Sequence, residues 1–341
     1  MKIAALLNGR AKRVTPRVER DLRRALPGAL VLVSHDFDEA SAHADRIVAD
    51  RPDVVLSGGG DGAAVRLLNL LRERGPLPIL GVLRLGTGNG WARVSGAPEF
   101  PDLLRRLPAL PLSLPTQTFD LVEVDGQLCH FAGVGWDARI LNDYSRNLDK
   151  RGAQLLGARA ATWLNKSALG YVYSTLRISV PELWREQRLH GQARVLLESL
   201  EGPAYQLDRQ GRPLPIVDAD GGAPSRKLYD GPLSVGAASA TPEWGYGFKA
   251  FPHARAKPGH INLRIYDRPV LEAVRNAVRL WTGKSPQPGM SDFFVKRARM
   301  RFSRPMPFQI GGDPVGFREE ITFAVASETV RLVDWHAALA A

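Results

Sequence analysis

The chain has 341 residues, and at ~100 to 200 residues per domain this length predicts two domains. A hydrophobic fraction of 44% and a charged fraction of 24% are typical of globular proteins, which excludes wholesale disorder and the collagen-like and disulfide-rich classes. The formal net charge of +11 favours an anionic partner, such as a phosphate ester, an anionic lipid or a nucleic acid. The single cysteine, Cys129, rules out an internal disulfide and suits a reducing compartment.

Two stretches of sequence bear on localisation. The apolar run at residues 3–7 is too short for the core of a signal peptide. Charged residues interrupt the most hydrophobic long stretch, residues 155–180, so no run reaches the ~18 residues of a membrane-spanning helix. We therefore expect a cytoplasmic protein, which leaves peripheral contact with the inner face of the membrane open.

The first 110 residues alternate short apolar runs with helical patterns, as in a parallel sheet covered by helices on both faces. We expect strands at residues 3–7, 30–33, 54–56 and 79–83. Helices are predicted between them, from Pro16 with Thr15 as its N-cap, from about 38 to 49, and from about 63 to 72.

A proline-rich stretch at residues 98–115 marks a boundary, so we expect an α/β domain at 1–115 and a second domain at 116–341. Asp125-Gly126 predicts a tight hairpin turn between strands at 118–124 and 127–134. A helical insertion is expected at about 150–178. Later strand signals fit an antiparallel β-sandwich or barrel, at residues 233–237, 261–266, 294–302, 308–310, 321–325 and 330–333.

Two glycine-rich stretches carry the chemistry. Residues 57–62, Ser-Gly-Gly-Gly-Asp-Gly, leave a buried strand and enter a helix, where backbone amides can approach phosphate oxygens. Residues 83–93, Leu-Arg-Leu-Gly-Thr-Gly-Asn-Gly-Trp-Ala-Arg, follow the next strand and so meet the same edge of the sheet. The spacing matches neither the Walker loop nor the dinucleotide fingerprint, which leaves another kind of phosphate site.

These stretches resemble a known family. Gly59-Gly60-Asp61-Gly62 is similar to the GGDGT signature of the bacterial diacylglycerol kinase-like lipid kinases, which are related to sphingosine kinases and to NAD kinases. Residues 85–93 resemble that family's LGTxNDFAR segment, residues 7–9 its NPxSG loop, and residues 309–314 occupy the place of its DGE segment. NAD kinases lack the GTxNDFAR segment, which favours the lipid branch.

The resemblance implies an N-terminal α/β domain of the phosphofructokinase/NAD-kinase type, a C-terminal β-sandwich, and an ATP-dependent lipid kinase with ATP and Mg²⁺ as cofactors. It implies that Asp61 serves the phosphate and metal side and that Asp313 takes the proton of the acceptor hydroxyl, with Asp137 the next acid to test. No metal-ligand set is assigned. The nucleotide-binding residues that it implies are Asn8, Gly9, Arg10, Ser34, Gly59, Gly60, Asp61, Gly62, Ala63, Gly86 and Thr87.

Several positions depart from the family's pattern. Ala63 replaces the family's Thr, Arg66 replaces Glu, and Gly90 replaces Asp. Gly311 replaces the first acid of the DGE segment, and Pro258 replaces the Asp of a metal-supporting Asp-Gly pair. These losses support an alternative, a catalytically impaired relative that binds nucleotide or lipid as a regulatory module. Asp313 itself can equally be a turn residue of a Gly-Gly-Asp-Pro hairpin.

The expected partners are ATP and a diacylglycerol-like or sphingoid lipid; the sequence leaves the acceptor lipid and the oligomeric state open. No recognised motif supports nucleic-acid binding, which would depend on charge alone. Strand periodicity at residues 294–302 places Arg297, Arg299 and Arg301 on one face. That face is either a solvated strand surface or a footing for an anionic membrane.

Overall fold

The computed structural model describes residues 1–111, 113–136, 138–139, 180–218, 221–244, 247–276, 279, 282–283 and 287–340. The chain divides into two compact units. The first comprises residues 1–121, 243–247 and 327–341, and the second comprises residues 122–242 and 248–326. The predicted boundary at residue 115 differs from this division, because residues 116–121 and 327–341 pack with the first unit.

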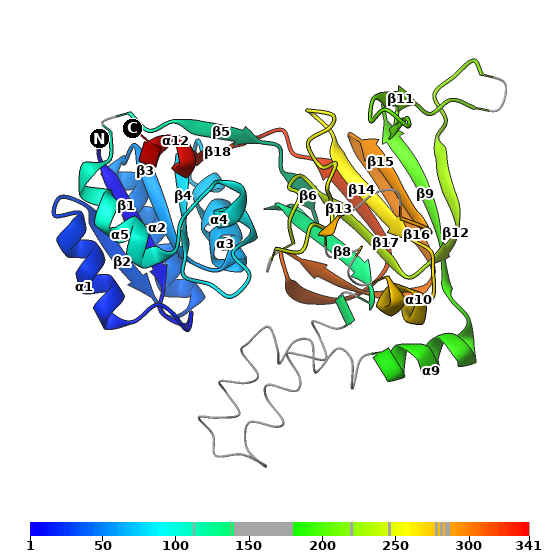
Figure 1. Ribbon diagram of the computed structural model, residues 1–341, viewed down its shortest axis with the longest axis horizontal. Helices are drawn as coiled ribbons and strands as arrows, with labels where there is room; N and C mark the ends of the chain where they lie inside the picture. Colours follow the sequence, from blue (N-terminus) through cyan, green and yellow to red (C-terminus); the bar gives the residue numbers. More distant parts are fainter. Residues whose placement is uncertain are drawn as a thin grey trace, which may run out of the picture. The chain divides into compact units, whose positions relative to one another are not determined.

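The first unit is built on a six-stranded sheet in the order β2-β1-β3-β4-β18-β5 (Figure 1). Its strands are β1 (Ile3–Asn8), β2 (Leu30–Ser34), β3 (Val54–Gly59), β4 (Ile79–Arg84), β5 (Thr116–Phe119) and β18 (Val330–Val333). All neighbouring pairs are parallel except β18 and β5. The chain moves to one side of β1 to form β2 and to the other side to form β3, so the carboxyl ends of β1 and β3 make a topological switch point.

Helices cover both faces of this sheet. They are α1 (Pro16–Ala25), α2 (Phe37–Asp50), α3 (Asp61–Arg72), α4 (Gly90–Val94), α5 (Phe100–Arg106), a 3₁₀ turn (Leu107–Ala109) and α12 (Trp335–Ala340). Helices α2 and α3 contact each other, and α1 contacts α5. The predicted cap is confirmed, because the Thr15 hydroxyl accepts from the amide of Val18 at 3.3 Å.

Strand β18 corrects one expectation. Residues 330–333 are predicted in the antiparallel domain, whereas all four of them pair with β5 and Leu332 also pairs with Leu80 of β4. An ion pair of 2.9 Å between Arg72 and Glu328 joins this returning segment to α3. A short apolar run carries no information about which sheet it joins, because its partners lie hundreds of residues away.

The second unit is an antiparallel sheet, and among the described residues twelve strands are linked by hydrogen bonds (Figure 1). They are β6 (Val122–Val124), β7 (Gln127–Cys129), β8 (Phe131–Gly135), β9 (Ala193–Glu201), β10 (Tyr205–Leu207), β11 (Pro213–Pro215), β12 (Lys227–Leu233), β13 (Val235–Ser239), β14 (Ile261–Tyr266), β15 (Met290–Val295), β16 (Arg297–Ile310) and β17 (Asp313–Val325). Two helices accompany them, α9 (Val180–His190) and α10 (Val270–Arg275). The predicted insertion at 150–178 lies outside the described residues.

The predicted Asp125-Gly126 turn is present, with both residues at positive φ, but it joins the short strands β6 and β7. The predicted strand at 294–302 breaks at Lys296, between β15 and β16. Arg297 and Arg301 are exposed there, while Ala298 and Met300 are buried, so the predicted alternation is confirmed.

A buried ion pair fixes one end of the second unit's core. Arg264, on β14, meets Asp292, on β15, through two parallel bonds of 2.8 Å. The amide of Asn262 donates to the same carboxylate at 3.0 Å. A buried guanidinium without its carboxylate is strongly destabilising, so these residues have a structural role.

Two further observations limit the chemistry of the chain. No helix in the described parts is both long and apolar enough to cross a membrane. Cys129 is fully buried, and burial raises the pKa of its thiol well above the usual range, which removes it as a nucleophile.

Candidate functional site

The predicted nucleotide residues gather at the carboxyl edge of the parallel sheet in the first unit. Asn8 ends β1, Ser34 ends β2, and Gly59 ends β3. Ser34 lies beside Asn8 in the parallel register, and its carbonyl accepts from the amide of Gly9 at 2.8 Å. The loop after β4 contains Gly86 and Thr87, so four successive loops meet at one edge of the sheet.

Asp61 is the centre of this edge and is 8% exposed. Its Oδ2 accepts from the amide of Gly90 at 2.9 Å, and its Oδ1 accepts from the amide of Trp91 at 2.9 Å. Gly90 and Trp91 are the first two residues of α4, whose amides have no partner within the helix. Asp61 therefore ties the loop after β3 to the loop after β4 by capping the helix that follows it.

The two glycine-rich loops touch through their backbones. A Cβ atom on Gly86 would lie 2.1 Å from the Cα of Gly60 and 2.8 Å from the carbonyl oxygen of Gly59. A Cβ atom on Gly60 would meet only ordinary contacts, at 3.5 Å from the Cα of Gly86 and 4.0 Å from the amide of Thr87. Packing inside the protein thus requires glycine at position 86 and leaves position 60 free to take alanine.

The first turn of α3 supplies hydrogen-bond donors. Gly60 is its N-cap and offers no side chain to the helix amides. Ala63 and Ala64 donate to the carbonyl of Gly60, whereas the amides of Asp61 and Gly62 find no carbonyl among the described residues. Unfilled amides at the start of a helix attract anions, because the helix dipole adds partial positive charge.

Asn89 closes the loop after β4 and is a site residue beyond those predicted from the sequence. It lies in the left-handed region at φ 55°, and its side chain bonds Gly86 twice, accepting at 2.9 Å and donating at 2.7 Å. The signal was present in Gly-Asn-Gly, because asparagine tolerates this conformation and commonly bonds the nearby backbone. Arg10 and Thr87, at the ends of the neighbouring loops, are exposed.

Asp313 belongs to the second unit, whereas the glycine-rich loops belong to the first. It is the first residue of β17, paired with Ile310, and Gly311 and Gly312 form the two-residue turn between them. Both glycines have positive φ, at 59° and 93°, as a tight hairpin turn requires. Asp313 is exposed, and Asp137, the alternative acid, is outside the described residues.

The acidic side chains that the structure describes do not fit a magnesium ion held by the protein. Within the described ranges no group of three or more His, Cys, Asp or Glu side chains could hold a metal. Asp61 is the one acid on the loops after β1, β3 and β4, and each of its oxygens already accepts an amide hydrogen bond. Its observed contacts are those of a group that holds the loops together.

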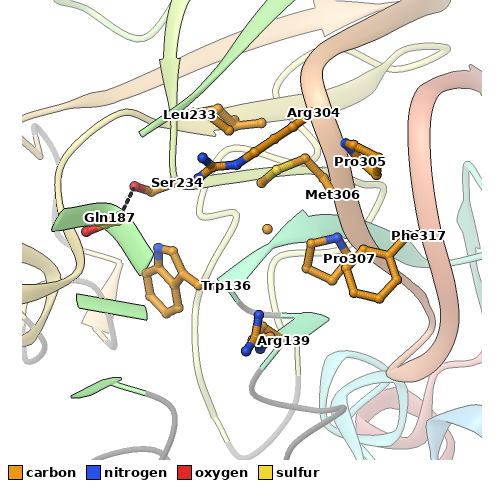
Figure 2. Close-up of a pocket in the computed structure, with 12 residues that line it drawn as sticks. Trp136, Arg139, Gln187, Leu233, Ser234, Arg304, Pro305, Met306, Pro307 and Phe317 are labelled. Atoms are coloured by element: carbon orange, nitrogen blue, oxygen red, sulfur yellow. Dashed lines mark hydrogen bonds between the residues drawn. The ribbon is translucent and has the colours of Figure 1, made fainter. Parts of the chain in front are cut away.

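The second unit contains a small cavity of about 50 Å³. Figure 2 shows Trp136 and Gln187 on one side of it and Pro307 and Phe317 on the other, with Gln187 bonded to Ser234 at 3.3 Å. Ligand pockets usually measure ~300 to 1,000 Å³. This cavity has room for ordered water and is too small for an acyl chain.

Comparisons with known proteins agree with this geometry. Residues 5–124 match the family model of the diacylglycerol kinase catalytic domain. No curated protein matches the chain. A diacylglycerol kinase structure from Bacillus anthracis strain Sterne shares 12% identity and a TM-score of 0.61, covering 99% of this chain and 98% of that one.

A second structure from the same organism, of a protein proposed to be a diacylglycerol kinase, shares 14% identity and a TM-score of 0.63 and covers 97% of this chain and 96% of that one. At such identity the likeness shows the fold. It confirms the expected architecture, a parallel α/β unit followed by an antiparallel one. Residues 5–124 of this chain are thus similar to the diacylglycerol kinase catalytic domain, and the whole chain has the fold of these two bacterial structures.

Proposed function

We propose that this protein is an ATP-dependent lipid kinase that phosphorylates a hydroxyl of a diacylglycerol-like or sphingoid lipid. The observation that carries the proposal is the edge of the first unit, where two glycine-rich loops pack backbone to backbone beside the unfilled amides of α3. The family match over residues 5–124 supports the same reaction class.

In the proposed reaction the acceptor oxygen bonds to the γ-phosphorus of ATP while the bond to the β–γ bridging oxygen breaks and ADP leaves. The amides of Asp61 and Gly62 hold phosphate oxygens, and Asp61 keeps the two loops in register through α4. Asp313 is the proposed acceptor of the hydroxyl proton. Mg²⁺, if used, enters with the nucleotide phosphates, since phosphates commonly supply part of its ligand shell.

A second candidate function is a nucleotide- or lipid-binding module with little turnover. It is favoured by the contacts of Asp61, because both of its carboxylate oxygens accept hydrogen bonds from amides of α4. The substitutions at Ala63 and Arg66, two motif positions of α3, favour it as well. Such a protein would keep the nucleotide site and lose the transfer step.

The deciding experiment incubates the purified chain with γ-labelled ATP, Mg²⁺ and a panel of diacylglycerols, sphingoid bases and ceramides in mixed micelles. A labelled lipid supports the kinase. ADP binding by calorimetry without a labelled lipid supports the binding module, and absence of both contradicts both proposals.

The nucleotide site is tested by Gly60→Ala, with Gly28→Ala as its matched control. A methyl group at position 60 fits the fold but enters the space between the loops, so we expect ADP to bind about tenfold more weakly or worse. Nothing lies within 4 Å of a Cβ on Gly28, so that variant should bind ADP as the original chain does. Equal ADP affinity in both variants would remove the loops from the site.

The arginines of β16 are the proposed contact with an anionic membrane, and a neighbouring carboxylate reduces their net charge. The carboxylate of Glu198 accepts hydrogen bonds from Arg301 at 2.6 Å and from Arg299 at 3.2 Å. These bonds hold the pKa of Glu198 below its usual value, and the bond from Arg301 contributes most. The arginine row of β16 is therefore partly neutralised. We expect binding to anionic vesicles to weaken as salt rises, measured by co-sedimentation against neutral vesicles.

A further inference from the structure

The first unit contains a second cavity that the proposed reaction does not use. It is open to solvent, has a volume of about 620 Å³, and is lined by Arg84, Arg93, residues 96–98, Arg106, Trp335, His336, Leu339 and Ala340. Arg84 ends β4, and Trp335 and His336 begin α12 after β18. The cavity therefore lies at β4 and β18, whereas the switch point of the sheet lies at β1 and β3.

The charge of this cavity is positive. Arg84 forms an ion pair of 2.8 Å with Glu99, which also pairs with Arg13 at 3.3 Å. Arg93 and Arg106 have no carboxylate within ion-pair distance among the described residues. Arg93 donates to the carbonyl of Gly88 at 3.0 Å, and Arg106 reaches the carbonyl of Leu339 at 3.5 Å. The charge of Glu99 is thus shared between Arg84 and Arg13, which leaves the charges of Arg93 and Arg106 without a paired carboxylate in the described parts of the chain.

From this charge we propose a second anion site in the first unit, specific for the phosphate group of a free phosphate or of a phosphomonoester headgroup. Guanidinium groups match phosphate oxygens in fixed geometry, and none of the residues that line the cavity carries a carboxylate side chain. Arg93 lines the cavity and also donates to the carbonyl of Gly88, in the loop after β4.

The test is equilibrium dialysis of the full chain against labelled inorganic phosphate, at ionic strength fixed with sodium chloride. Arg106→Glu places a carboxylate at the cavity, and we expect phosphate to bind about tenfold more weakly or worse. Arg105→Glu is the matched control, because Arg105 is the neighbouring exposed residue on α5, is paired with Asp102, and makes the same change in net charge. Phosphate affinity of Arg105→Glu should stay within about twofold of the original value, and Gly60→Ala is dialysed in parallel to show how much phosphate binds at the glycine-rich loops.

The proposal is overturned if phosphate binding does not saturate, or if Arg105→Glu and Arg106→Glu weaken phosphate binding equally. It is also overturned if only Gly60→Ala loses phosphate binding, because the phosphate would then lie on the glycine-rich loops. The failure of the kinase assay would leave this test unaffected. A second arm repeats the dialysis with dihexanoyl phosphatidic acid below its micelle concentration. Tighter binding of this lipid than of inorganic phosphate, lost in Arg106→Glu, identifies a lipid headgroup as the source, and equal or weaker binding identifies free phosphate.

Discussion

The tripeptide Gly-Gly-Asp occurs in both units and has a different physical role in each. At residues 59–61 the glycines allow two backbones to touch, and the buried aspartate caps the start of α4. At residues 311–313 the glycines take positive φ angles in a two-residue turn, and the exposed aspartate begins β17.

The difference teaches that a motif's letters do not define its chemistry. In the first unit the glycines are needed for space and the acid for two hydrogen bonds, so the motif holds a site together. In the second unit the glycines are needed for backbone conformation, and the acid is left at the surface of a hairpin. Substitutions at the two places should therefore fail in different ways.

The largest expected effect is on turnover. If Asp313 accepts the hydroxyl proton, Asp313→Asn should lower the transfer rate by ~10² to 10⁴-fold. Its free energy of unfolding should change by less than ~0.5 kcal/mol, because the residue is exposed. Lipid phosphorylation and urea unfolding measure the two quantities, and near-normal turnover would move the base to another acid.

Asp61→Asn should show the opposite pattern, with a loss of stability. The asparagine amide would place a donor opposite the amide of Gly90 or of Trp91, so one bond to a charged acceptor is lost and a buried donor is left unpaired. We expect a loss of ~2 to 4 kcal/mol in the free energy of unfolding, together with weaker ADP binding. Unfolding at the original midpoint would show that the helix cap contributes little.

Gly86→Ala should destabilise through a collision. Its Cβ would lie 2.1 Å from the Cα of Gly60, so a backbone must move, at a cost of ~1 to 3 kcal/mol. Gly60→Ala is the matched variant, because its Cβ meets only ordinary contacts. Thermal unfolding compares them, and equal melting temperatures would contradict the close packing of the two loops.

Gly312→Ala should cost less and for another reason. The nearest atom to its Cβ would be Cζ of Phe131 at 4.0 Å, so there is space, but φ at 93° is unfavourable for a residue with a side chain. We expect a loss of ~1 to 2 kcal/mol by urea unfolding. If Gly312→Ala lost as much free energy of unfolding as Gly86→Ala, or none, a strained backbone angle and a steric collision could not be told apart at these two positions.

The smallest expected effect is the response of stability to acid. In the first unit the hydroxyl of Ser327 and the guanidinium of Arg72 hold the pKa of Glu328 below its usual value. The side chain of Gln117 and the amide of Ala337 do the same for the pKa of Asp334. A carboxyl with a lowered folded pKa adds stability above its unfolded pKa of about 4, and this stability is lost as the pH falls through the folded value.

Denaturation between pH 7 and pH 3 should therefore show a decline at the acid end. Glu328→Gln should be less stable than the original chain at pH 7, by less than ~1 kcal/mol, with a difference that narrows towards pH 3. A constant difference across this range would show that the Glu328 carboxylate contributes nothing through its charge.

Local signals were sufficient to predict the parallel half of the fold. Thr15 and Pro16 fix the start of α1, and short apolar runs separated by helical patterns fix β1 to β4. The place of β18 could not be predicted, because its pairing with β4 depends on residues about 250 positions away in sequence. The predicted strands at 118–124 and 127–134 each break in the structure, at residues 120–121 and at residue 130, and their apolar pattern does not mark these breaks.

The candidate site divides in the same way. That Gly59, Gly60 and Gly86 meet at one edge follows from parallel strands, and the structure places them there. That Asp61 caps α4 does not follow, because its partners Gly90 and Trp91 lie on a five-residue helix too short to show a hydrophobic period. For Asn89 the local sequence Gly-Asn-Gly is a usable signal, because asparagine tolerates the left-handed conformation that the loop requires.

The return of the chain to its first unit has a consequence for biosynthesis. Strand β18 and helix α12 leave the ribosome after the whole antiparallel unit, so until then one edge of β4 is unpaired. Gly81 on β4 also lacks its contact with the Trp335 ring, which lies 3.0 Å from the position that a Cβ on Gly81 would occupy. A chain translated only to residue 124, where the family match ends, therefore lacks part of the first unit. Translation thus starts the α/β unit before the antiparallel unit and finishes it afterwards.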